Sequence, residues 1–174
     1  MPLSYRRPNI DEVAAFAELH VQCWREAFTE ILPADLVATF DAAQRVPMWQ
    51  RCLADEKRIV VGAYDNGKPV GFIIAGKPLE HLLQGTDGQI DTIYIAASHY
   101  RMGIGRQLIG RAARAWQEQG GHAFTLGVLA ENIRARSFYE SLGAKLALLT
   151  TYNWGGYDLP DAIYVFDDLP KFTP

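Results

Sequence analysis

Hydrophobic positions follow a helical period in the first third of the chain. Between residues 10 and 28 the apolar side chains recur three or four residues apart, which predicts an amphipathic helix. Asn9 followed by Glu12 fits a capping box at its start. A short strand over residues 3–7 precedes this helix, and Pro33 opens a region whose apolar spacing suits one or two further short helices.

The pattern changes to that of strands after residue 57. Residues 58–65 and 69–77 are β-branched-rich runs joined by Asn66 and Gly67, a dipeptide typical of hairpin turns. Further strands are expected over residues 89–95, 124–129, 146–152 and 161–167, and helices over residues 103–119 and around residues 135–142. Hairpins mixed with strand–helix–strand units predict a mixed α/β fold with helices on the faces of one sheet.

Composition narrows the function classes. The chain has 174 residues, of which 49% are hydrophobic, so we expect a single globular domain over residues 1–174. A net charge of −3 gives no electrostatic case for a nucleic acid or an anionic membrane as partner. No apolar run approaches the length of a bilayer span, and residues 1–8 are unlike a signal peptide, so a cytoplasmic location is expected. Cys23 and Cys52 are isolated, and we expect neither a metal site nor a disulfide framework.

A glycine-containing turn between a strand and a helix carries the first chemical signal. Gly103 and Gly105 allow the backbone to approach a ligand, and the helix start offers free N–H groups to an anion. Residues 98–117 include four arginines and no acidic residue, which favours a phosphate-bearing ligand. The alternative is a turn that only lets the helix pack against the strand. Leu108 stands where a Rossmann motif has its third glycine, so a nucleotide-binding domain is the weaker interpretation.

A second motif makes the signal specific. The segment from Asn132 to Gly143 reads Asn-x-x-Ala-x-x-Phe-Tyr-Glu-x-Leu-Gly and follows one strand after the glycine turn. Together, the two motifs resemble those of the GCN5-related N-acetyltransferase (GNAT) superfamily, most strongly over residues 89–143. The resemblance implies a mostly antiparallel sheet of about seven strands, flanked by about four helices and splayed between the fourth and fifth strands.

The resemblance also implies a site for acetyl-CoA in that splay. The backbone of Ile93, Tyr94 and Ile95 would pair with the pantetheine amides as an added strand would. Asn132 would contact the pantetheine arm, and Tyr139 would lie beside the sulfur. The pyrophosphate would be cradled by the amides of Arg101, Met102, Gly103, Ile104, Gly105 and Arg106.

The implied reaction is direct attack of a primary amine on the thioester. A backbone N–H near Ile93 or Ile95 can stabilise the oxyanion. Tyr139 is the candidate general acid, because a phenol with a pKa of about 10 can protonate a leaving thiolate held in a shielded site. Two structural alternatives stay open: Tyr139 could be a plain core aromatic, and Asn132 could simply cap the helix that follows it.

The general base is harder to assign. Gly127 stands where some ribosomal-protein N-terminal acetyltransferases carry a catalytic Glu. Asp91, on the strand beside the expected cleft, is the first candidate; Glu26 and Glu30 are weaker ones, and His99 has only its position beside the turn.

The sequence therefore predicts an acetyl-CoA-dependent N-acetyltransferase. Its acceptor is the amine of a small molecule or of a protein N-terminus. The alternative is a non-catalytic acyl-CoA-binding or sensing domain of the same fold. A homodimer is the default among oligomers, because two-fold dimers are the commonest.

Overall fold

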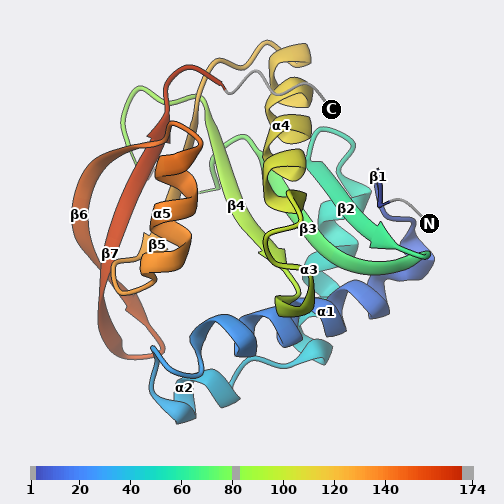
Figure 1. The fold of residues 1–174 in the computed structure, drawn as a ribbon, viewed down its shortest axis with the longest axis horizontal. Coiled ribbons are helices and arrows are strands. Elements are labelled where there is room, and N and C mark those ends of the chain that lie inside the picture. Colours follow the sequence, from blue (N-terminus) through green and yellow to red (C-terminus); the bar gives the residue numbers. More distant parts are fainter. Residues whose placement is uncertain (1–2, 80–82, 170–174) are drawn as a thin grey trace.

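Strands β1 to β7 form one sheet in the order β1-β2-β3-β4-β5-β7-β6 in the computed structural model, which describes residues 3–79 and 83–169 (Figure 1). Neighbouring strands are antiparallel except β4 and β5, which are parallel. The strands are β1 Ser4–Arg6, β2 Ile59–Asp65, β3 Lys68–Gly76, β4 Gly88–Ile95, β5 Phe124–Leu129, β6 Lys145–Trp154 and β7 Tyr157–Phe166. The predicted mixed, mostly antiparallel sheet is confirmed.

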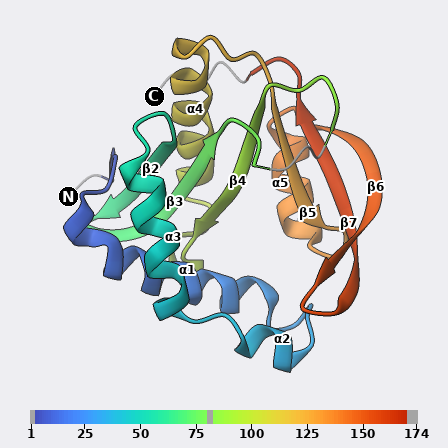
Figure 2. The ribbon, with the colours of Figure 1, turned by 180° about the vertical axis from the view of Figure 1, so that it is seen from behind.

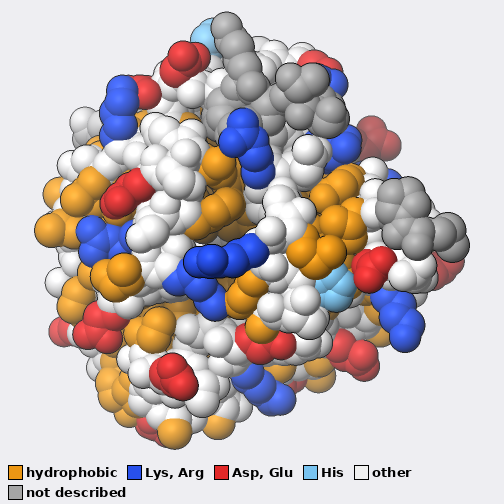
Figure 3. Space-filling model, viewed as in Figure 1, with side chains coloured by type: hydrophobic (Ala, Val, Ile, Leu, Met, Phe, Trp, Pro, Cys, Tyr) orange, Lys and Arg blue, Asp and Glu red, His pale blue; other side chains and the backbone are white. Residues whose placement is uncertain are grey.

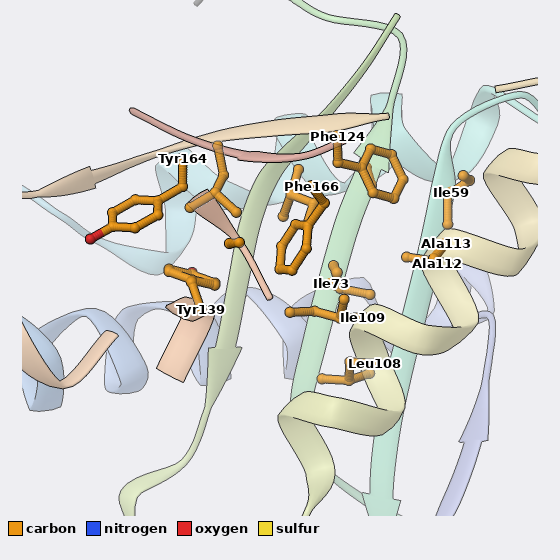
Figure 4. Packing of buried hydrophobic residues seen from close by; sticks show 14 of the residues in the cluster. Ile59, Ile73, Leu108, Ile109, Ala112, Ala113, Phe124, Tyr139, Tyr164 and Phe166 are labelled. Carbon is orange, nitrogen blue, oxygen red and sulfur yellow. The ribbon is translucent and has the colours of Figure 1, made fainter. Parts of the chain in front are cut away.

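Helices cover both faces of the sheet. They are α1 Val13–Phe28, α2 Ala34–Ala38, α3 Ala42–Ala54, α4 Ile104–Glu118 and α5 Ile133–Ser141. Helices α4 and α5 lie on the face seen in Figure 1, and α1 and α3 cover the opposite face, seen in Figure 2. Leu108, Ile109, Ala112 and Ala113 of α4 pack on the apolar side chains of the sheet (Figure 4). Within the described residues, no helix combines the length and apolar character that a bilayer crossing requires.

Local sequence explains most element boundaries. Asn66 and Gly67 both have positive φ, 49° and 79°, as the hairpin turn between β2 and β3 requires. The region after Pro33 divides into two helices because Asp41 caps α3, accepting a hydrogen bond from the Gln44 amide at 3.0 Å. The described residues thus contain five α-helices, in line with the expected number of about four. Strands β6 and β7 are longer than predicted because Gly155 and Gly156, at φ 57° and 89°, join them in a tight hairpin.

The sheet splits between β4 and β5, as expected for the fourth and fifth strands. Their recorded pairing comprises Gly88 with Phe124 and Gln89 with Thr125, although both strands continue beyond these residues. Asp87 fixes the closed end: its carboxylate accepts hydrogen bonds from the backbone amides of His122 at 2.8 Å and Ala123 at 2.9 Å. Past this clamp the strands diverge and leave polar backbone edges facing a gap.

Candidate active site

A cavity of about 1080 Å³ occupies the gap between β4 and β5. This volume slightly exceeds the roughly 300–1,000 Å³ that is usual for small-molecule sites, which suits a long ligand. Figure 3 shows the hollow, with hydrophobic side chains at its base and Lys or Arg side chains beside it. The start of α4, one face of α5 and aromatic side chains of α1 and β6 complete the wall.

The loop before α4 forms a cationic end of this cavity. Arg101 and Gly103 have positive φ, 63° and 79°, and the chain then enters α4 at Ile104. Since the first N–H groups of a helix have no partner within it, several amides here are available to an anion. Arg101, Arg106 and Arg134 line the same end. Exposed Met102 is absent from the lining, although its amide belongs to the same loop.

The two loop glycines serve different purposes. Gly103 supplies the left-handed conformation, and a Cβ there would meet nothing within 4 Å. A Cβ on Gly105 would lie 2.7 Å from the ring of Phe138 and 3.3 Å from Ile95. Gly105 is therefore required for close packing of α4 against α5 and β4. Packing thus explains why residue 105 has no side chain. Its backbone amide still lies in the first turn of α4, where it can bind an anion.

Contacts from three elements fix the loop. The Ala97 amide donates to Glu26 Oε2 at 2.7 Å, and His99 Nε2 lies 3.3 Å from Asp65 Oδ2. The guanidinium of Arg134 lies 4.2 Å from the centre of the Tyr100 ring. Glu26 therefore acts as an anchor for the loop outside the cavity lining, and exposed Glu30 is likewise absent from the lining.

Helix α5 brings Tyr139 to the cavity. Asn132 caps this helix by accepting a hydrogen bond from the Ala135 amide at 3.1 Å, and it also lines the cavity. Tyr139 is only 8% exposed, and burial raises its pKa, which keeps the phenol protonated at neutral pH. It belongs both to the apolar core beside Tyr164 (Figure 4) and to the cavity wall. The core and ligand-facing interpretations of Tyr139 are thus compatible.

Asp91 lies at an irregularity in β4. The register between β3 and β4 shifts between Ile74 and Ala75, and Asp91 is the extra residue. Its Oδ2 pairs with Arg58, while its Oδ1 is buried without a hydrogen-bond partner. Burial raises the pKa of Asp91 to about 6, against the opposing effect of the Arg58 guanidinium. Asp91 lines the cavity as a carboxyl group whose pKa is raised well above its ordinary value.

Sequence reasoning missed Asp161, Phe28 and Tyr152, which approach the cavity from other elements. Asp161 of β7 is 8% exposed, and burial raises its pKa to about 6. Phe28, Tyr152 and Trp154 line the same part of the cavity. A carboxylate within the apolar run Leu159 to Ile163 was the available signal for Asp161. The order of strands in the sheet, which differs from their order in the chain, brings Asp161, Tyr152 and Trp154 to the cavity wall.

The split sheet, the helix amino terminus and the buried phenol meet in one cavity of an α/β protein. The model of the Acetyltransferase (GNAT) family matches residues 13–144. The chain therefore belongs to the GNAT family and is an acyltransferase.

Known proteins of similar sequence and structure agree with this assignment. The chain is 26% identical over 168 residues to the uncharacterized N-acetyltransferase YuaI of Bacillus subtilis, covering 96% of this chain and 94% of YuaI. The structure of YncA, a putative acetyltransferase from Salmonella typhimurium with its cofactor acetyl-CoA, matches with a TM-score of 0.73 at 18% identity, over 100% of this chain and 98% of that one. PaiA N-acetyltransferase from Thermoplasma acidophilum in complex with coenzyme A matches with a TM-score of 0.71 at 16% identity, over 92% and 98% of the two chains.

Proposed function

We propose that this protein is an acetyl-CoA-dependent N-acetyltransferase that transfers the acetyl group directly to a primary amine in a ternary complex, with residues 1–174 forming one domain. The observation that carries the proposal is that one cavity joins the amino terminus of α4 to the buried Tyr139 phenol. The complexes of YncA with acetyl-CoA and of PaiA with coenzyme A support the choice of carrier.

Each part of acetyl-CoA has a candidate partner along the cavity. Because β5 diverges from β4, the backbone of Ile93 to Ile95 has an open edge that can pair with pantetheine amides. Asn132 lines the next part of the wall and can contact the same arm. The amides from Arg101 to Arg106 are suited to the pyrophosphate, and Arg134 at the rim is suited to the remaining phosphate.

The reaction needs an acid for the leaving thiolate and a base for the attacking amine. The neutral amine attacks the thioester carbon, a carbon–nitrogen bond forms, and the carbon–sulfur bond breaks. Tyr139 donates its proton to the leaving thiolate, and Oδ1 of Asp91, directly or through water, takes the proton that the amine loses. An amide of β4 near Ile93 or Ile95 stabilises the transient oxyanion.

The pH dependence of the rate tests the role of Asp91. A base must be deprotonated, so its contribution is lost as pH falls through its pKa of about 6. We expect the slope of log kcat/KM against pH to increase by about one unit below that pH, which gives a break in the plot. Asp91→Asn should lower kcat/KM about 100-fold and remove this break. Asp158→Asn is the matched control, because Asp158 is exposed and its carboxylate accepts a hydrogen bond from the Asn153 side chain at 2.8 Å, outside the cavity lining. An unchanged rate and break in Asp91→Asn would exclude Asp91 as the base.

Release of CoA thiol in the presence of a panel of primary amines tests the proposed activity itself. The proposal expects acetyl-CoA to bind in calorimetry and to be consumed with at least one amine. Binding without turnover on any amine would favour the alternative, a non-catalytic acyl-CoA sensor. The cytoplasmic location stays a prediction, to be tested by cell fractionation.

Strand β6 supports a homodimer. It forms an edge of the sheet, residues 146–154 carry no charge, and Leu146, Leu148 and Leu149 are exposed. Uncharged apolar edges pair readily with other strands, and a second copy of β6 can pair antiparallel about a two-fold axis. Sedimentation velocity is expected to show a dimer that Leu149→Lys converts to a monomer. A monomeric wild-type protein at micromolar concentration would contradict this prediction.

A further inference from the structure

Asp161 is a buried carboxylate that forms no ion pair with another described residue. It lies in β7 opposite Leu129 of β5 and Thr150 of β6, and it lines the cavity while only 8% exposed. Its hydrogen-bond partner is the backbone amide of Ala162, and no ion pair to it occurs among the described residues. A buried charge without a partner is costly to the fold, so a ligand cation is the natural counterpart.

Charge divides the cavity into two parts. The arginines of the lining lie where we propose that the coenzyme phosphates bind. They are Arg101 in the loop before α4, Arg106 in the first turn of α4 and Arg134 in α5. The carboxylates of the described lining, Asp91 and Asp161, lie on β4 and β7 instead. Phosphates would be repelled there, so these carboxylates face the part of the cavity that remains for the acceptor.

The two carboxylates are too far apart to bind one nitrogen. Following the register, Asp91 lies level with Gly127 of β5, which pairs with Ile163, and Asp161 is two residues further along β7. Two strand spacings separate them across the sheet, so their Cα atoms are at least roughly 10 Å apart even before the strands diverge. An acceptor that contacts both needs two separate polar groups.

The wall beyond Asp161, on the side away from Asp91, suits a cationic chain. Tyr152 and Trp154 follow Thr150 on β6, their rings are 5.9 Å apart, and both line the cavity together with Phe28. Trp154 is held in place by Trp24, with ring centres 4.4 Å apart. Aromatic faces attract cations and pack against methylene groups.

We propose that Asp161 determines specificity by binding a second protonated nitrogen of the acceptor, so that the preferred acceptor is a small flexible diamine or polyamine. Asp91 serves the reacting amine, and Asp161 holds the distal one. This inference rests on the proposed N-acetyltransferase function.

The test compares acceptors that differ only at the distal end. Thiol release is measured with α,ω-diaminoalkanes of increasing length, with monoamines of the same carbon number and with the matching amino alcohols. We expect kcat/KM for the best diamine to exceed that of its matched monoamine by about 10- to 100-fold, the usual worth of a charge-assisted hydrogen bond. Asp161→Asn should remove this preference through KM, with kcat and the monoamine kinetics little changed.

Two further variants make the test specific. Asp161→Glu keeps the charge and should retain the preference for diamines, and Asp158→Asn, on the exposed part of the same strand, should behave as wild type. If Asp161→Asn fails to fold, the wild-type ratio of diamine to amino alcohol decides the question.

The outcomes separate the two proposals. Turnover on amines without a preference for diamines would overturn this inference and leave the activity intact. A loss in Asp161→Asn that is equal for monoamines and diamines would overturn it too. No turnover with any amine would overturn the proposed function itself.

Discussion

Replacing Tyr139 by phenylalanine is expected to lower kcat at least about 100-fold while leaving the affinity for acetyl-CoA almost unchanged. The ring of Tyr139 packs in the core, and phenylalanine retains that packing. Only the hydroxyl that we propose as the proton donor to the leaving sulfur is removed. Since burial raises the pKa of the phenol, it is protonated throughout the neutral range and is available as an acid. Steady-state kinetics and calorimetry with acetyl-CoA measure the two quantities.

Tyr164→Phe is the matched control for this variant. The Tyr164 hydroxyl accepts a hydrogen bond from Arg136 Nε at 3.0 Å and donates one to Glu140 Oε1 at 2.5 Å. Tyr164 does not belong to the cavity lining. Removing the Tyr164 hydroxyl should therefore lower the free energy of unfolding more than it lowers kcat. If Tyr139→Phe kept the wild-type kcat, Tyr139 would be a core aromatic and the general acid would have to be sought elsewhere.

Replacing Arg58 by leucine is expected to lower the free energy of unfolding by about 3–5 kcal/mol, the usual cost of leaving a buried charge without its partner. The side chains of Arg58 and Asp91 are only 8% and 14% exposed. Arg58 Nη1 also donates to the carbonyl of Lys77 at 2.6 Å. Arg6→Leu is the matched control, because its ion pair with Glu12 is more exposed and should contribute less than about 1 kcal/mol.

The pH dependence of this loss identifies its cause. Asp91 has a folded pKa of about 6, above the ordinary 3.8, so its charged form costs stability that grows as pH rises from 3.8 to about 6. Without Arg58 that pKa rises further, so the deficit of Arg58→Leu should be larger at about pH 8 than at about pH 5. The double variant with Asp91→Asn should recover much of it. Urea unfolding that gives the same deficit at both pH values would contradict this explanation.

Motifs carried by contiguous residues were predictable from the sequence. The turn from Tyr100 to Arg106, the cap at Asn132 and the helix carrying Tyr139 each depend on local chemistry. Gly105 shows the limit of such reasoning, because a glycine needed for a ligand and one needed for packing on Phe138 look alike in sequence.

Contacts between distant strands were not predictable. Arg58 precedes β2 and meets Asp91 only because β4 carries a bulge there. Asp161 reaches the cavity because β7 inserts between β5 and β6, so strand order differs from chain order. Neither register nor strand order leaves a local signature, so the Arg58–Asp91 pair and the place of Asp161 in the cavity emerged only from the structure.

A crystal structure of the protein with coenzyme A would test most directly whether the split between β4 and β5 is the coenzyme site. The account predicts the diphosphate within hydrogen-bonding distance of amides between Arg101 and Arg106, and the sulfur beside the Tyr139 hydroxyl. Coenzyme bound at another surface, with this gap filled only by water, would contradict it.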